Sequence, residues 1–205
     1  MRVIPLHRDS DSDYSGMSYW VLGDHNEAAD RNTLIDTGSA NLANLGYFMH
    51  QMSILAKGIG KMAIEQVILT HEHFDHAGGL PGIERQFDPK VYSYLPLGVQ
   101  HVAVRDGMHV MVGDQDAILL HTPGHSADSI CIYLPAVRTL FSGDTIFRIT
   151  DSAGSYPRTY LTSLERIATL DIQTIYPGHG TPITSDVKSF ITTCIENVAR
   201  SVTND

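Results

Sequence analysis

The segment from His71 to His76 constrains this chain more than any other feature, because His-Glu-His-Phe-Asp-His places three imidazoles and the carboxylate of Asp75 in six positions. The apolar run at 64–70 has the length and the β-branched centre of a buried strand, so the segment begins where a strand ends. Alternate side chains of an extended backbone point the same way, which lets His71 and His73 converge on one ion. Asp75 and His76 precede two glycines that allow the chain to turn, so they can reach a second ion.

Three later segments carry the same residue types beside glycine or proline. Given the histidine and aspartate content of the chain, His-x-His-x-Asp-His arises by chance only about 0.003 times over its whole length. Each later segment follows a predicted strand, and loops at one end of a sheet are where sites are commonly assembled. Without a thiolate, these ligands suit zinc, iron or manganese, and their spacing suits two ions better than one. The segments are TPGHS with His125, SGDT with Asp144, and PGHG with His179.

The hydrophobic pattern of the chain predicts two groups of short strands, each leading to amphipathic helices. This order favours a mixed α/β (α+β) fold in which sheet packs on sheet and helices cover the outer faces. No linker or repeat interrupts the pattern, so residues 1–205 are predicted to form a single domain. Strands are expected at 2–6, 18–22, 33–36, 64–70, 91–94, 109–112, 117–121, 130–134, 139–141 and 172–176, and helices at about 42–52, 160–170 and 186–202.

Composition excludes several classes of partner and location. The net charge is −9 and no two Lys or Arg are adjacent, which disfavours a nucleic-acid partner. The longest apolar run, 130–137, has eight residues, too few to cross a membrane. The N-terminus lacks the features of a secretory signal, and Cys131 and Cys194 are interpreted as buried small hydrophobic residues. We therefore expect a cytoplasmic protein with no membrane partner.

Five blocks of this sequence resemble the metallo-β-lactamase superfamily, and within it the glyoxalase II-like hydrolases. The resemblance implies a four-layer αββα sandwich with a dinuclear site at one edge. Asp36 would hold a ligand or a loop by hydrogen bonding, although a plain turn aspartate is an equally good interpretation. The blocks are Asp36-Thr37-Gly38, THEHFDHAGG at 70–79, TPGHS at 122–126, SGDT at 142–145 and PGHG at 177–180. One implied metal has the ligands His71, His73 and His125, the other has Asp75, His76 and His179, and Asp144 bridges the two.

The same resemblance implies a thioester or ester hydrolase of glyoxalase II type, in which a metal-bridging hydroxide attacks a carbonyl. Two divalent ions about 3.5 to 4 Å apart bring the pKa of a shared water towards neutrality, and their remaining positive charge stabilises an oxyanion. Asp75 and Asp144 are the residues expected to be catalytic. Zinc is the first choice of metal, with iron or manganese as alternatives, the substrate is expected to be a small molecule, and a homo-oligomer is left open. Candidate substrate contacts are Arg148, Tyr156, Arg158 and Tyr160.

Two departures from the hydroxyacylglutathione hydrolases put glutathione in doubt as the substrate. The sequence leaves room for one helix after His179, where those enzymes have a helical domain, and 147–154 lacks their Gly-Cys-Gly-Arg-like segment. A mononuclear iron oxidoreductase resembling the persulfide dioxygenases is the second hypothesis, because those enzymes share most of the motifs, although they too favour the missing segment. A lactonase ranks lower, because the lactonases place a tyrosine three residues after the bridging aspartate, where this sequence has Phe147. A metal-stabilised binding module without catalysis also ranks lower, because structural zinc sites usually have four closed positions and often cysteine ligands.

Overall fold

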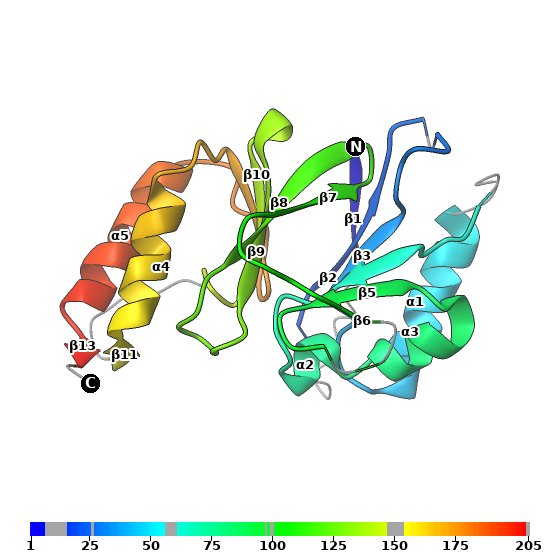
Figure 1. The fold of residues 1–205 in the computed structure, drawn as a ribbon, viewed down its shortest axis with the longest axis horizontal. Helices are drawn as coiled ribbons and strands as arrows, with labels where there is room; N and C mark the ends of the chain where they lie inside the picture. Colours follow the sequence, from blue (N-terminus) through cyan, green and yellow to red (C-terminus); the bar gives the residue numbers. More distant parts are fainter. Residues whose placement is uncertain are drawn as a thin grey trace.

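Two β-sheets lie face to face in the computed structural model, and helices cover the outer face of each sheet (Figure 1). The structure describes residues 1–6, 16–25, 27–55, 61–96, 98, 101–146 and 154–203. Helices α1 and α3 cover one sheet, and α4 and α5 cover the other (Figure 1). The predicted mixed α/β sandwich with four layers is confirmed.

The first sheet has six strands in the order β1-β2-β3-β4-β5-β6. The pairs β1–β2 and β2–β3 are antiparallel, whereas β3 to β6 are parallel. Parallel neighbours need crossover connections, and helices supply them after β3 and after β4. The elements are β1 (Arg2–Leu6), β2 (Ser18–Leu22), β3 (Thr33–Ile35), α1 (Leu42–Leu55), β4 (Gln66–Ile68), α2 (Phe74–Ala77), α3 (Leu80–Phe87), β5 (Lys90–Ser93) and β6 (His101–Ala103).

The second sheet has five strands in the order β12-β10-β9-β8-β7. Strands β7 to β10 pair antiparallel, and β10 pairs with β12 in parallel. The short strands β11 and β13 pair separately, beside the start of α4 and the end of α5. The elements are β7 (Met108–Val112), β8 (Gln115–His121), β9 (Ile130–Leu134), the 3-10 helix η1 (Pro135–Val137), β10 (Thr139–Gly143), β11 (Tyr156–Pro157), α4 (Arg158–Ala168), β12 (Thr174–Pro177), α5 (Val187–Ala199) and β13 (Val202–Thr203).

Three apolar clusters correspond to the three contacts between layers. The first lies between the sheets, where Val21 and Ile68 meet Leu119 and Ile132. The second packs the β10 and β12 side of the molecule against α4 and α5, and it includes both buried cysteines. The third packs the first sheet against α1 and α3. The prediction that Cys131 and Cys194 are buried is confirmed.

The sequence pattern missed β6, α2, α3 and the two-residue strands β11 and β13. Helix α3 was missed because Pro81 and Gly82 suggest a turn, yet proline is well tolerated at the first positions of a helix. Asp75 and His76 lie inside the one-turn helix α2 instead of in an open turn. The residue before the last helix, Asp186, has a left-handed conformation. The other predicted elements are present, with bounds shifted by a few residues.

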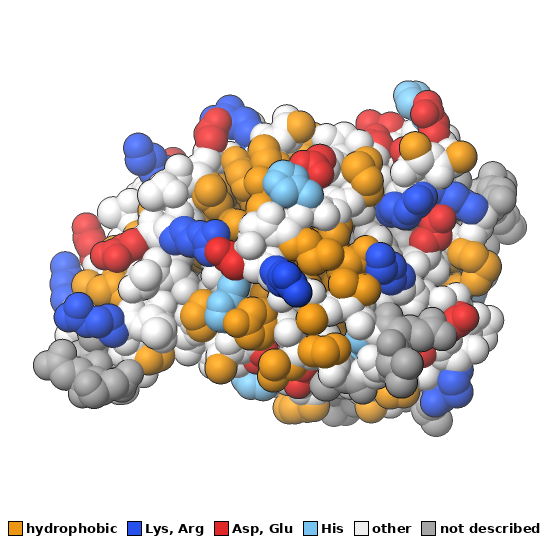
Figure 2. All heavy atoms as spheres, viewed as in Figure 1, with side chains coloured by type: hydrophobic (Ala, Val, Ile, Leu, Met, Phe, Trp, Pro, Cys, Tyr) orange, Lys and Arg blue, Asp and Glu red, His pale blue; other side chains and the backbone are white. Residues whose placement is uncertain are grey.

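Two observations bear on membrane and nucleic-acid partners. Within the described part of the chain, no helix combines the length and apolar character needed to cross a bilayer. On the face shown in Figure 2, Lys and Arg side chains lie mostly apart, among acidic and apolar ones. The absence of a nucleic-acid partner stays a prediction.

Candidate metal centre

The topology directs the carboxyl ends of five strands to one edge of the sandwich. Strands β3 and β4 are parallel, so the residues after them, Asp36 and His71, lie at the same edge. In the second sheet β8, β10 and β12 run in one direction, and they lead to His125, Asp144 and His179. The two edges meet, since the amide of Ile130 donates to the carbonyl of Thr70 at 2.8 Å. Residues distant in sequence are thereby collected into one cluster.

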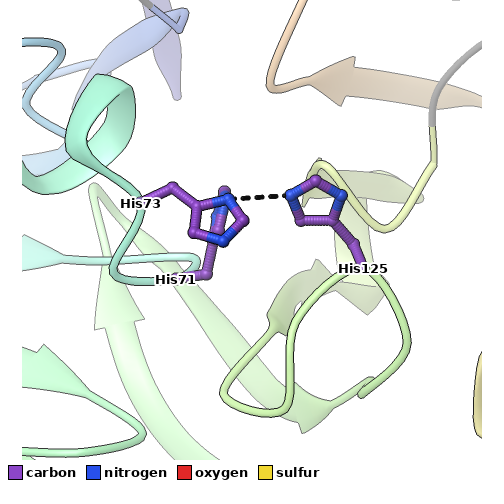
Figure 3. Close-up of side chains that lie close together, drawn as sticks. All are labelled: His71, His73 and His125. Atoms are coloured by element: carbon purple, nitrogen blue, oxygen red, sulfur yellow. Dashed lines mark hydrogen bonds between the residues drawn. The ribbon is translucent and has the colours of Figure 1, made fainter.

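His71, His73 and His125 form the first group that could hold a metal ion, with their ligand atoms within 4.8 Å of one another. Figure 3 shows His71 and His73 from one segment facing His125 from the loop between β8 and β9. Nδ1 of His73 lies 3.0 Å from Nε2 of His125. The ring centre of His71 lies 4.5 Å from that of His73 and 4.9 Å from that of His125. Three imidazoles therefore share one small volume.

Asp75, His76 and His179 form a second such group. Nε2 of His179 lies 3.1 Å from Oδ2 of Asp75 and 3.4 Å from Nε2 of His76. Nε2 of His76 lies 3.6 Å from Oδ2 of Asp75. Asp75 and His76 are consecutive residues of α2, so the loop after β12 has to supply only the third donor.

Asp144 lies between the two groups. Its Oδ1 is 3.3 Å from Nε2 of His76, and its Oδ2 is 3.5 Å from Nε2 of both His125 and His179. A third candidate group contains Asp144 with His71 and His76. One carboxylate thus contacts donors of both sets, which is the arrangement a bridging ligand requires.

The spacing of these donors suits divalent metal ions. Four donors placed tetrahedrally about 2.1 Å from zinc lie about 3.4 Å from one another. The contacts above range from 3.0 to 3.6 Å. Nε2 of His71 and Oδ1 of Asp144 are buried and make no hydrogen bond. Buried polar atoms without partners are rare, and a cation at this point would satisfy both.

The electrostatics of the cluster agree with a cation site. Burial and the neighbouring His76 lower the pKa of His71 to about 4, so this imidazole is neutral and can coordinate. Burial alone would lower the pKa of His76, but the carboxylates of Asp36 and Asp144 raise it to about 10. Burial alone would raise the pKa of Asp144, but the neighbouring imidazoles of His179 and His76 hold it well below its usual range. Positive charge is strongly favoured at the centre of the cluster.

Asp36 connects the two groups of candidate ligands through hydrogen bonds. Its Oδ2 accepts hydrogen bonds from Nδ1 of His76 at 2.8 Å and from the hydroxyl of Thr70 at 2.7 Å, and its Oδ1 accepts from the Thr70 amide at 2.7 Å. The Thr70 oxygen lies 3.1 Å from Nδ1 of His71. A proton on each Nδ1 completes this chain, so that Nε2 of both imidazoles faces the cluster. Of the two interpretations of Asp36, this placement favours the one in which it orients a ligand.

Two glycines give the cluster room. A Cβ added to Gly178 would lie 2.2 Å from Oδ1 of Asp144 and 2.7 Å from the ring of His76. A Cβ on Gly16 would also lie 2.7 Å from that ring. The sequence pattern did not identify Gly16, because its neighbours in the fold lie far along the chain.

The candidate substrate contacts differ in their surroundings. Tyr160 is 1% exposed, and its hydroxyl donates to the carbonyl of Thr145 at 2.8 Å. This hydrogen bond indicates that Tyr160 supports the loop that carries Asp144. Tyr156 is half-buried with its ring centre 5.5 Å from that of Tyr160, and Arg158 is exposed at the start of α4. Arg148 lies outside the described residues.

Comparison with known sequences gives one family. A family model described as the metallo-beta-lactamase superfamily matches residues 14–179. The beta-lactamase-like protein 2 homolog of Caenorhabditis elegans is 33% identical over 190 residues, 89% of this chain and 61% of that protein. An atrochrysone carboxyl ACP thioesterase of Aspergillus fumigatus is 32% identical over 173 residues, 82% of this chain and 52% of that protein. The chain thus spans between 52% and 61% of the length of these two relatives.

Solved structures are similar over nearly the whole chain. ETHE1 from Myxococcus xanthus has a TM-score of 0.70 and 26% identity, and the match covers 98% of this chain and 84% of that one. A metallo-beta-lactamase family protein from Thermus thermophilus has a TM-score of 0.74 and 21% identity, covering 95% of this chain and 78% of that one. At 21% identity, the similarity to the Thermus thermophilus protein shows a shared fold.

Proposed function

The chain belongs to the metallo-β-lactamase superfamily, and on that premise we propose that it is a metal-dependent hydrolase of small-molecule thioesters or esters. The observation that supports this most is the convergence of five histidines and two aspartates at separations that suit metal coordination. Relatives named as thioesterases support hydrolysis of a thioester in particular. More specifically, we propose a glyoxalase II-like activity.

We assign two divalent ions to the cluster, zinc first, with iron or manganese as alternatives. His71, His73 and His125 would hold one ion, Asp75, His76 and His179 the other, and Asp144 would contact both. Bound there, the ions would lower the pKa of a water molecule and polarise the substrate carbonyl.

The remaining steps fall to side chains of this chain. His71, His76 and Asp75 are buried and form the floor of the cluster, whereas His73 is exposed and His125 and His179 are partly exposed. A substrate would therefore approach from the side of His73 and His125. Asp36 and Thr70 hold the two floor imidazoles in one tautomer, so the donors need no reorganisation when the substrate binds. A thiolate leaving group needs no strong general acid, so a cluster made of imidazoles and carboxylates suits hydrolysis of a thioester.

The test compares His73→Ala and Asp144→Ala with His109→Ala. His109 is a control because its side chain is 61% exposed and pairs with Asp116 on the neighbouring strand, outside the cluster. We expect the two cluster variants to lose at least about a thousandfold in kcat/KM on acyl thioesters, including S-lactoylglutathione, with unchanged far-UV circular dichroism. His109→Ala should retain the wild-type rate. Full activity of Asp144→Ala would refute the proposal.

A mononuclear iron oxidoreductase of the persulfide dioxygenase kind is the alternative, and it is favoured by one observation. The three histidines His71, His73 and His125 could hold one ion without the second group. Metal analysis of the purified protein separates the two functions, together with a panel of thioesters, lactones and phosphodiesters. One iron per chain and oxygen uptake with a persulfide would favour the oxidoreductase. Two metals per chain with thioester hydrolysis would favour the hydrolase.

A further inference from the structure

A cavity of about 710 Å³ adjoins the proposed metal centre, between the loop after β12 and the first half of α5. His179 forms part of its wall, so the cavity and the proposed metal centre share this residue. Ile146 and Cys194 line it with only 1% and 2% exposure, and both belong to the core beneath α4 and α5. Phe190 lines it as well and packs against the same core. One side of the cavity is therefore apolar and fixed by the core.

The rest of the described lining is rich in hydroxyl groups. Among the described residues, Thr181, Ser189 and Thr193 contribute them. None of these lining residues is Lys or Arg, and Asp186 is the one carboxylate among them. An anionic group would meet no Lys or Arg among the described lining residues, whereas an apolar chain would meet Ile146 and Phe190. The volume lies within the range of about 300 to 1,000 Å³ that small-molecule sites occupy.

We propose that this cavity, which we call the acyl pocket, binds the neutral, apolar acyl chain of the substrate while the scissile carbonyl lies at the metal centre beside His179. The inference rests on the proposed function and narrows its substrate class to thioesters of uncharged, medium-length acyl groups. Each methylene buried in such a pocket strengthens binding about fourfold. Affinity should therefore rise steeply with chain length.

Two neighbouring threonines of α5 give a matched pair of variants. Thr192 and Thr193 are both exposed, and each hydroxyl donates to the carbonyl four residues earlier, at 2.9 Å and 3.0 Å. Thr193 lines the acyl pocket and Thr192 does not. Thr193→Phe would fill the pocket, whereas Thr192→Phe places the same ring on the same helix outside it.

The first measurement is binding of S-alkyl N-acetylcysteamine thioethers, which cannot be hydrolysed, by isothermal titration calorimetry. We expect the octyl compound to bind at least about 30-fold more tightly than the ethyl compound, to the wild type and to Thr192→Phe. In Thr193→Phe the difference should fall below about threefold, with unchanged far-UV circular dichroism. Equal chain-length dependence in both variants, or none in the wild type, would overturn the acyl pocket.

The second measurement distinguishes this inference from the proposed function. Acetyl and octanoyl thioesters of N-acetylcysteamine are compared as substrates of the wild type, and the octanoyl ester should have the higher kcat/KM. Hydrolysis of both at the same rate would overturn the acyl pocket and leave the hydrolase standing. Tight octyl binding without any hydrolysis would support the acyl pocket and contradict the hydrolase.

Discussion

Asp36 has a left-handed backbone conformation, with φ at 57°, directly after β3. Such a conformation costs about 1 to 3 kcal/mol in residues other than glycine, and it persists where the surroundings hold it. Three hydrogen bonds to Thr70 and His76 hold Asp36 in place, and the chain of contacts extends to His71. A residue outside the ligand set thus sets the orientation of one imidazole in each proposed metal group.

We predict that Asp36→Asn weakens metal binding about 10- to 100-fold. Asparagine tolerates the left-handed conformation, so the backbone should keep its course. Its amide group would face Nδ1 of His76, which favours the tautomer whose proton occupies Nε2, the atom meant for the metal. Competition with a chromophoric chelator measures the affinity.

Asp30→Asn is the matched control for that variant. Asp30 is a buried aspartate, 6% exposed, that accepts a hydrogen bond from the amide of Glu27 in the loop between β2 and β3. Its replacement should lower the free energy of unfolding and leave metal affinity unchanged. Equal metal affinity of Asp36→Asn and the wild type would show that Asp36 is a plain turn aspartate.

At the scale of elements, the start of β2 connects the two halves of the centre. The amide of Gly16 donates to the carbonyl of Asp75 at 2.9 Å, and the amide of Met17 donates to that of Gly178 at 2.7 Å. The hydroxyl of Tyr19 donates to the carbonyl of Pro177 at 2.6 Å, across 158 positions of sequence. One strand of the first sheet therefore fixes the loop that carries His179.

We predict that Tyr19→Phe reduces metal occupancy of the group containing His179. The phenyl ring would keep its edge contacts with Phe141 and Tyr176, so the main loss is the hydrogen bond to Pro177. Leaving that buried carbonyl without its partner should lower the free energy of unfolding by about 1 to 3 kcal/mol. Metal content after dialysis and urea unfolding give the two readouts.

Tyr133→Phe is the control that separates a loss of protein stability from a loss of positioning of the loop that carries His179. The hydroxyl of Tyr133 also donates to a backbone carbonyl, that of Asp171, at 3.0 Å, and it lies outside the proposed centre. This variant should lose similar stability and keep its full metal content. If both variants kept or both lost the metal, the connection through β2 would have no specific role in the site.

At the scale of the whole molecule, the core between the sheets contains none of the proposed metal ligands. Val21, Leu119 and Ile132 are completely buried between two sheets whose strands are paired along their lengths. The proposed ligands lie at the edge of this sandwich, in the loops that follow the strands and in helix α2. The fold should therefore persist without metal, unlike a small domain whose structure depends on its zinc.

We predict that a chelator removes activity while far-UV circular dichroism stays at its native value. The melting temperature should fall, because a ligand that binds only the native state stabilises it. Adding back zinc, iron or manganese separately should restore activity with one metal best. Loss of secondary structure together with the metal would instead support a structural metal and the binding-module hypothesis.

Part of this architecture could be predicted from local sequence. A run such as that before His71 is apolar and β-branched, and strand formation there follows from neighbouring residues. Strand β6 has three residues, none of them buried, and α2 has a single turn, so neither leaves a periodic pattern. Their formation depends on the parallel pairing with β5 and on the packing around the cluster.

The sequence by itself determined which residue types stand at the ends of the strands, and hence the seven candidate donors and their chemistry. The tertiary structure decided which donors share a group, that Asp144 lies between the groups, and that Asp36 and Tyr19 support them. Residue type and strand ends are local properties of the chain. Proximity between Asp36 and His76, or between Tyr19 and Pro177, arises only when strands far apart in sequence pack together, and no pattern within either segment records it.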